Sequence, residues 1–240
     1  MSFKGVKLCR LSQYLECVRV IFFLLVQDVP LPVALFFMGG INKSVDLSPG
    51  GASNAVYSDI TLAPGPFGNP NGSLFLGTSN SHMELENRGE IDTRFSISVF
   101  AWVHLSNSST GQIIDYGCSM TVFHSTLGVE ALFKERDSSK SYLLHKRGVL
   151  KANSWNFIGV TYDYFSGIAT MWVNENIVMR KLLFAKMELA THGNIIVGTS
   201  KNRKMKFRGR ISCLQFYEQA LSEDQIMKVK IRCNKTGKWV

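Results

Sequence analysis

The chain has 240 residues, of which 45% are hydrophobic and 19% are charged, and its formal net charge at pH 7 is +9. This composition excludes a disordered chain, and the length suits one large β-sandwich as well as two small domains. The positive charge favours acidic partners such as sulfated polysaccharide, anionic lipid headgroups or nucleic acid, although a basic surface without such a partner is the simpler alternative.

The N-terminal segment resembles a secretory leader only in part. Several cations precede the apolar run Val20–Val26, but no small-residue cleavage site follows it. Charged residues and prolines within Val18–Met38 argue against a membrane-spanning helix. We therefore predict that 1–31 is an atypical leader or a non-domain segment, that 32–233 is the folded domain, and that 234–240 is a C-terminal tail.

From about residue 32 onward the sequence predicts one short strand after another. In Phe95–Leu105 one alternating set of residues is wholly apolar and the other is half apolar, which is typical of a central strand in a two-sheet sandwich. Trp155–Tyr162 and Ile168–Val173 are predicted to form a hairpin whose turn contains Gly167. Further short strands are predicted at Leu74–Leu76, Met83–Leu85, Gln112–Tyr116, Leu127–Phe133 and Ile177–Met179.

One short α-helix is predicted close to the C-terminus, at about residues 223–232. Ser222 is a good N-cap, and Gln225 completes a capping box. The sequence thus predicts an all-β fold, namely a two-sheet antiparallel β-sandwich of the jelly-roll type with one short C-terminal α-helix.

The predicted helix also indicates a disulfide. Ile226, Val229 and Cys233 fall on one helix face, so that Cys233 points back to the body of the protein. Cys213 lies in the preceding predicted strand, Ile211–Tyr217. A bridge between the two cysteines would close a loop of about 20 residues and contribute roughly 3 kcal/mol. Two free buried thiols are the alternative.

The other cysteines and the glycosylation sequons bear on the compartment. Cys9 and Cys17 fall in the N-terminal segment, and no role is assigned to Cys118. The absence of a C-x-x-C pair argues against a zinc ribbon or a thioredoxin-type motif. An excess of N-x-S/T sequons indicates an oxidising, secretory environment, the alternative being a cytosolic protein with accidental sequons. The candidate N-glycosylation sites are Asn42, Asn71, Asn107 and Asn234.

Five segments of the chain form an ordered set that is typical of one family: Phe95–Val103, Ser154–Asp163, Met171–Asn174, Phe207–Tyr217 and Ala220–Ile226. This set resembles the laminin-G-like jelly-roll domains of the concanavalin-A-like lectin/glucanase superfamily. The resemblance covers about Pro32 to Cys233, with Pro32–Phe37 similar to the first strand of the family. It implies a secreted or cell-surface protein that binds glycans, glycosaminoglycans or proteins, sometimes through calcium on the sandwich rim.

The resemblance does not assign a metal site. The acidic residues that bind calcium in the family cannot be placed on this chain one by one, so the metal ligands are unknown and calcium stays open. No other cofactor is expected. The five histidines are scattered without ligand spacing.

Because the superfamily includes glycoside hydrolases, a pair of carboxyl groups suited to hydrolysis would indicate an enzyme. Retaining enzymes use two carboxyl groups about 5–5.5 Å apart. The motif E-x-D-x-x-E would supply such a pair on one strand, but the nearest piece, Glu90–Asp92, has Phe95 in the place of the second glutamate. The serine-hydrolase, P-loop, zincin and EF-hand motifs are also absent. We therefore expect no enzymatic activity.

The most basic part of the sequence is Lys201–Arg210, called the basic segment below, in which six of ten residues are cationic and none is acidic. If it begins a strand, Met205 and Phe207 point inward and the cations form a row at about 6.6 Å spacing, which suits a linear polyanion. A charged edge strand that resists aggregation is the alternative. The four cations of the predicted heparin- or glycan-binding row are Lys204, Lys206, Arg208 and Arg210.

Together these observations predict a non-catalytic extracellular recognition module. The expected partner is an acidic polysaccharide, another glycan, or an adhesion or matrix protein, and the alternatives are a glycoside hydrolase or a purely structural matrix module on the same sandwich. Nucleic acid is not expected, because no aromatic stacking platform accompanies the basic segment. No transmembrane span is expected, and the chain is predicted to be secreted or part of a cell-surface protein. Its oligomeric state stays open.

Overall fold

The structure is a computed structural model that describes residues 29–40, 45–51, 55–105, 110–123 and 126–234. The chain divides into Met1–Pro30, of which only the last two residues are described, and Leu31–Val240. The predictions for Cys9, Cys17, Asn42 and Asn107 lie outside the described residues. In the described ranges, no helix is long and apolar enough to cross a membrane.

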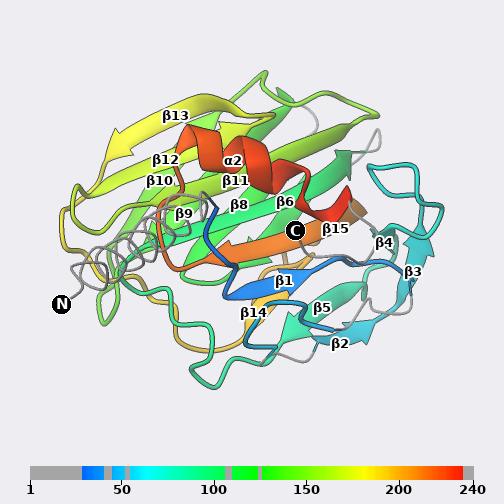
Figure 1. Cartoon of the computed structure of the whole chain (residues 1–240), viewed down its shortest axis with the longest axis horizontal. Coiled ribbons are helices and arrows are strands. Elements are labelled where there is room, and N and C mark those ends of the chain that lie inside the picture. Colours follow the sequence, from blue (N-terminus) through cyan, green and yellow to red (C-terminus); the bar gives the residue numbers. More distant parts are fainter. Residues whose placement is uncertain (1–28, 41–44, 52–54, 106–109, 124–125, 235–240) are drawn as a thin grey trace, which may run out of the picture. The chain divides into compact units, whose positions relative to one another are not determined.

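Leu31–Val240 is built from two antiparallel sheets (Figure 1). The larger sheet has eight strands, of which seven follow in the order β13 (Asn176–Leu182), β12 (Ile168–Val173), β11 (Trp155–Tyr162), β6 (Ile97–Leu105), β15 (Gly209–Tyr217), β4 (Ser73–Leu76) and β3 (Ile60–Ala63). The eighth, β1 (Ala34–Phe36), pairs with β15. The smaller sheet has the order β10 (Ser141–Lys146), β9 (Gly128–Lys134), β8 (Cys118–Phe123), β7 (Thr110–Asp115), β14 (Ile195–Val197), β5 (His82–Leu85) and β2 (Ala55–Ser58).

The core lies between the two sheets and explains the alternation of apolar residues along the strands. In β9, for example, Val129, Ala131 and Phe133 are buried in the core, while Glu130 and Lys134 are only partly buried on the other face. The same hydrophobic cluster takes side chains from strands of both sheets. The two-layer β-sandwich predicted from period-two patterning is therefore confirmed.

The second face of the central strand β6 is half apolar because a helix covers it. The helix α2 (Glu223–Lys230) lies over the larger sheet (Figure 1). Beneath it, the Phe100 ring stacks on Phe157 with 5.3 Å between ring centroids, and the Trp102 indole nitrogen donates to the Lys230 carbonyl at 3.0 Å. The exposed Phe95 precedes the strand, which begins two residues later than predicted.

The predicted capping box fixes the start of α2. The Ser222 hydroxyl accepts a hydrogen bond from the Gln225 backbone nitrogen, and the Gln225 side-chain oxygen accepts one from the Ser222 backbone nitrogen at 2.9 Å. Ile226 and Val229 are fully buried. The α-helix ends at Lys230, two residues before the predicted end, and the 3₁₀ turn η3 (Arg232–Asn234) follows.

Candidate functional site

The basic segment connects the two sheets instead of running along one strand. It follows β14 of the smaller sheet and ends in β15 of the larger one. Lys206 forms an isolated bridge with Gln112 of β7, and β15 begins only at Gly209. Of the four predicted cations, Arg210 alone lies in a strand. The prediction of a single row made by Lys204, Lys206, Arg208 and Arg210 on one strand face is therefore wrong.

A polar turn explains the difference. The Ser200 hydroxyl accepts hydrogen bonds from the backbone nitrogens of Lys204 at 3.1 Å and Met205 at 3.0 Å. The Asn202 side-chain oxygen also accepts from the Lys204 nitrogen, at 3.1 Å. In a strand, the backbone nitrogens of Lys204 and Met205 would pair with a neighbouring strand, but here side-chain oxygens take their place as acceptors. As a result Met205 is 41% exposed, contrary to the prediction, whereas Phe207 is fully buried as predicted.

The alternative of a charged edge strand is also wrong, because β15 lies inside the larger sheet with β6 and β4 as hydrogen-bonded neighbours. Arg210 donates to the Pro64 carbonyl at 3.1 Å, and its guanidinium carbon lies 5.4 Å from the centroid of Trp155. Burial and the nearby Arg210 charge together lower the pKa of His104, the cross-strand partner of Arg210. Arg210 therefore belongs to a cluster on the larger sheet, away from β7.

A groove of about 580 Å³ lies on the outer face of the smaller sheet. Residues of β7, β8, β9 and β10 form its floor, and the turn of the basic segment contributes a wall. Because neighbouring residues of a strand point to opposite faces, the residues that line the floor are those that the core does not use. The groove is lined by Gln112, Asp115, Thr121, Glu130, Leu132, Lys134, Leu143, Ser200, Lys201, Asn202 and Met205.

Both carboxylates of the groove have basic or N–H partners. Asp115 accepts from Lys134 Nζ at 3.4 Å and from the Lys201 backbone nitrogen at 2.7 Å. Glu130 lies 2.8 Å from His145 Nδ1. These contacts fix the direction of each carboxylate, so the groove presents an ordered set of charges and not a single acidic or basic surface.

The register of the strands sets the distance between these two carboxylates. Asp115 lies opposite Ser119, which in turn lies opposite Leu132, whereas Glu130 lies opposite Thr121. Asp115 and Glu130 are therefore two strands and two residues apart, or roughly 12 Å between their Cα atoms at ordinary sheet spacing.

The groove is a site that the sequence pattern does not reveal. The strand that includes Glu130 and Leu132 is predicted, but nothing in its sequence assigns a function to the residues on the outer face. The only signal was the alternation of Glu130, Leu132 and Lys134 with buried residues. In the ranges that the structure describes, no three side chains of His, Cys, Asp or Glu gather closely enough to hold a metal ion.

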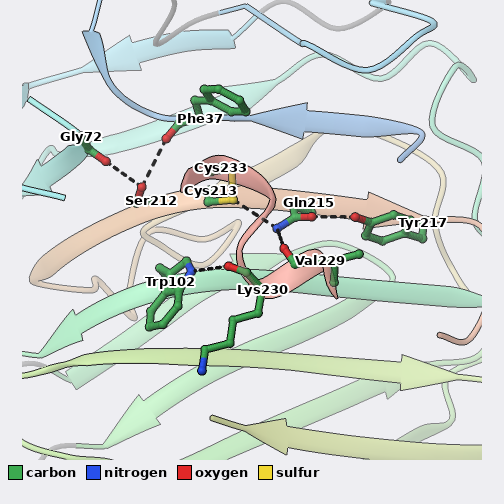
Figure 2. The surroundings of a disulfide bond; sticks show 10 residues. All are labelled: Phe37, Gly72, Trp102, Ser212, Cys213, Gln215, Tyr217, Val229, Lys230 and Cys233. Carbon is green, nitrogen blue, oxygen red and sulfur yellow. Dashed lines mark hydrogen bonds between the residues drawn. A yellow bond between two sulfur atoms is a disulfide. The ribbon is translucent and has the colours of Figure 1, made fainter. Parts of the chain in front are cut away.

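The structure contains a disulfide between Cys213 and Cys233, with 5.9 Å between their Cα atoms (Figure 2). The fully buried Gln215 side chain of β15 links this strand to α2 beside the disulfide. Its amide nitrogen contacts the Cys213 sulfur and donates to the Val229 carbonyl, each at 3.1 Å, and its oxygen accepts from the Tyr217 hydroxyl at 2.6 Å. Burial raises the pKa of Tyr217. The disulfide thus fastens the end of α2 to β15.

The bridge reaches β15 at an irregularity. The pairing of β15 with β6 shifts between Ser212 and Gln215, and Cys213 between them has a left-handed φ of 52°. The Ser212 hydroxyl donates to the carbonyls of Phe37 at 3.3 Å and Gly72 at 2.7 Å (Figure 2). Side-chain hydrogen bonds and the disulfide therefore support the strand where its ladder is interrupted.

Two of the predicted glycosylation sites can be placed. Asn71 and Asn234 are both exposed, Asn71 in a turn before β4 and Asn234 at the end of η3. Cys118 is the first residue of β8. Occupancy of the sequons stays a prediction.

Solved structures with the same fold include binding domains of botulinum neurotoxins. The serotype D binding domain is 15% identical with a TM-score of 0.66, and the match covers 84% of this chain and 51% of that chain. The serotype D ligand binding domain in complex with N-acetylneuraminic acid is 14% identical with a TM-score of 0.64, covering 83% and 50%. This chain thus spans about half the length of those structures, and at such identities the likeness shows the fold alone.

Comparison with curated proteins gave no match. A family model of laminin G type, described as concanavalin A-like lectin/glucanases superfamily, matches residues 76–227. This range runs from the end of β4 to the middle of α2, so it includes most strands of both sheets and the residues on the groove floor. With more than half of the sequence matched and both sheets in place, the chain belongs to the concanavalin A-like lectin/glucanases superfamily.

Proposed function

We propose that the chain is a non-catalytic extracellular recognition module that binds a glycan in the groove of the smaller sheet. The observation that supports this most is the groove itself, whose volume of about 580 Å³ lies in the usual range of ligand sites. Most of its lining comes from hydrogen-bonded strands, so the site is formed before a ligand arrives.

The lining suits a sugar chemically. The amide groups of Gln112 and Asn202 can bind sugar hydroxyl groups, while Leu132, Leu143 and Met205 offer apolar surface to the C–H groups of a ring. Polar groups of fixed direction next to a few apolar contacts are what orient a small ligand in a pocket.

An acidic glycan fits this lining better than a neutral one. Lys134 and Lys201 line the groove, and the exposed Lys204 belongs to the turn that forms its wall. Sulfate or carboxylate groups would form charge-assisted hydrogen bonds with these cations, and such binding weakens as salt is added. Heparin binding thus stays part of the proposal, but the cations of the groove and its wall take the place of a straight row of cations as the binding surface.

The contacts of the two carboxylates support a non-catalytic role, because Asp115 and Glu130 each already have a basic or N–H partner. A general acid needs a raised pKa and a position next to the glycosidic bond, together with a second carboxylate across it. A reducing-sugar assay on a panel of polysaccharides tests this part, and release of reducing ends would favour the hydrolase alternative.

A glycan array probed with the full chain in calcium and in EDTA tests the binding proposal. Leu132→Asp places a negative charge on the groove floor and should abolish binding to acidic glycans. Val56→Asp is the matched control, because Val56 is 69% exposed in β2 at the opposite edge of the smaller sheet from β10. Equal binding by both variants would exclude the groove, and an array without signal in either buffer would favour a purely structural matrix module.

The proposed extracellular location rests on the disulfide and on the exposed sequons at Asn71 and Asn234. Non-reducing mass spectrometry of protein expressed in eukaryotic cells tests it, because the spectra report the disulfide and the occupied asparagines together. Recovery only inside the cells, with free thiols and bare sequons, would contradict this location.

A further inference from the structure

The strands β11 and β13 finish at the end of the sandwich where β6 begins. Exposed apolar side chains gather at this end. The strands concerned are labelled in Figure 1. Phe165 is 79% exposed, Leu182 69% and Phe184 63%. Single exposed apolar residues are common, but several at one end of a domain mark a contact surface. We call this surface the aromatic tip; it consists of Phe95, Tyr164, Phe165, Leu182 and Phe184.

The aromatic tip is held in place by the backbone beneath it. The Tyr164 ring contacts Phe95 at 5.1 Å and Phe165 at 5.5 Å between centroids. The Tyr164 nitrogen donates to the Ser96 hydroxyl at 3.0 Å, and its carbonyl accepts from the Lys186 nitrogen at 2.6 Å. Three separate loops are thus tied together, so the exposed rings cannot fold back into the core.

Cations stand between the apolar residues of this surface. Lys181 and Lys186 are exposed on either side of Leu182 and Phe184. In the described part of the chain, no carboxylate lies within ion-pair distance of either lysine. The nearby carboxylate of Asp163 accepts hydrogen bonds from its own turn. Lys181 Nζ donates to the Leu143 carbonyl at 3.3 Å, which leaves its charge in place. The aromatic tip therefore carries positive charge that no described carboxylate neutralises by an ion pair.

This chemistry fits a lipid surface better than a protein partner. The buried centres of protein interfaces are depleted in lysine, whereas here Lys181 and Lys186 flank the apolar residues along the chain. At a bilayer, aromatic rings settle at the boundary of headgroups and acyl chains, and lysine stems pack there with their ammonium groups at the headgroups. We propose that the aromatic tip docks on membranes that contain anionic phospholipid, with Phe165 and Phe184 inserted.

Sedimentation of the full chain with vesicles tests this surface. The chain should bind phosphatidylcholine vesicles that contain phosphatidylserine and bind plain phosphatidylcholine vesicles much less. Phe165→Ser and Phe184→Ser should each lower the partition coefficient roughly tenfold, and Lys181→Gln and Lys186→Gln about fivefold each on the anionic vesicles. Phe75→Ser is the matched control, since Phe75 is 43% exposed in β4, far from β13 in the strand order.

The outcomes separate this inference from the glycan proposal. Leu132→Asp in the groove should leave vesicle binding unchanged, so loss of glycan binding and loss of membrane binding are independent results. The inference is overturned if wild-type protein ignores anionic vesicles, or if Phe75→Ser lowers binding as much as Phe165→Ser does. It is equally overturned if the aromatic tip holds two copies of the chain together, which sedimentation equilibrium would report as a dimer that Phe184→Ser dissociates.

Discussion

Removing the Cys213–Cys233 disulfide should lower the free energy of unfolding by about 3 kcal/mol. The two cysteines are separated by 20 positions, and closing a loop of that length restricts the unfolded chain by about this amount in the chain-entropy description. Cys233→Ser is the change of choice, because Cys233 is only partly buried whereas Cys213 is fully buried. The capping box of α2 and its two buried apolar residues remain, so the helix should stay docked.

Urea unfolding of wild type and Cys233→Ser measures this loss. With a slope of about 3 kcal/mol per M for a domain of this size, the midpoint should fall by about 1 M. The docking of α2 can be followed by tryptophan fluorescence, because the Trp102 indole donates to the Lys230 carbonyl at its end. Far-ultraviolet circular dichroism of the native variant should stay close to that of wild type.

A reducing agent is the matched control for the same bond. It should bring the wild-type midpoint down to that of Cys233→Ser and leave the variant where it is. An equal midpoint for oxidised wild type and the variant would refute the reasoning, since the loop would then contribute nothing to stability. A variant that loses its sheet signal in water would also refute it, because α2 and β15 would then depend on the bridge to fold at all.

Three further predictions concern other parts of the molecule. Burial raises the pKa of Tyr162 from 10.0 to about 12, so its stabilising contribution is complete below pH 10 and is lost as the pH rises towards 12. Tyr162→Phe should therefore flatten the fall in unfolding free energy over that pH range, and an equal slope of unfolding free energy against pH in both proteins would contradict this. Asp46→Ala should lower the free energy of unfolding in urea by about 3 kcal/mol, because the buried Asp46 carboxylate accepts from the backbone nitrogens of Leu35 and Ser48 at 2.9 Å each. A loss of unfolding free energy smaller than that of a surface substitution would contradict this. Asn71→Gln should remove one glycan from protein expressed in eukaryotic cells, seen as a mass difference that glycosidase treatment abolishes; equal masses before treatment would show that Asn71 is bare.

The long central strands could be predicted because their side chains are packed on both faces. Trp155–Tyr162 is almost entirely buried and was placed with its observed bounds, and the hairpin to Ile168–Val173 followed from the turn between them. Ile195–Val197 was missed, because three residues give too short a pattern to recognise. Ser141–Lys146 was missed because it is an edge strand in which only Leu144 is buried, so its sequence shows no clear alternation.

The groove could not be predicted, because it depends on strand register across four strands. Glu130 and Thr121 become neighbours only through the pairing of β9 with β8, and no local pattern states which residues will face each other. The predicted row of cations on the basic segment is wrong for a local reason. A single hydroxyl, that of Ser200, turns the chain by accepting two backbone N–H groups, and alternation of charged and apolar residues does not reveal such a bond.

The pairing of β1 with β15 has a mechanical consequence. The first strand of the sandwich pairs Phe36 with Leu214 of β15, and the disulfide joins the last helical turn to Cys213, the residue next to it. A pull on the segments before β1 and after η3 would therefore pass through a few residues of one strand. The groove has no lining residue on that path. Under such a pull, the groove would stay undistorted until the hydrogen bonds between β1 and β15 shear apart.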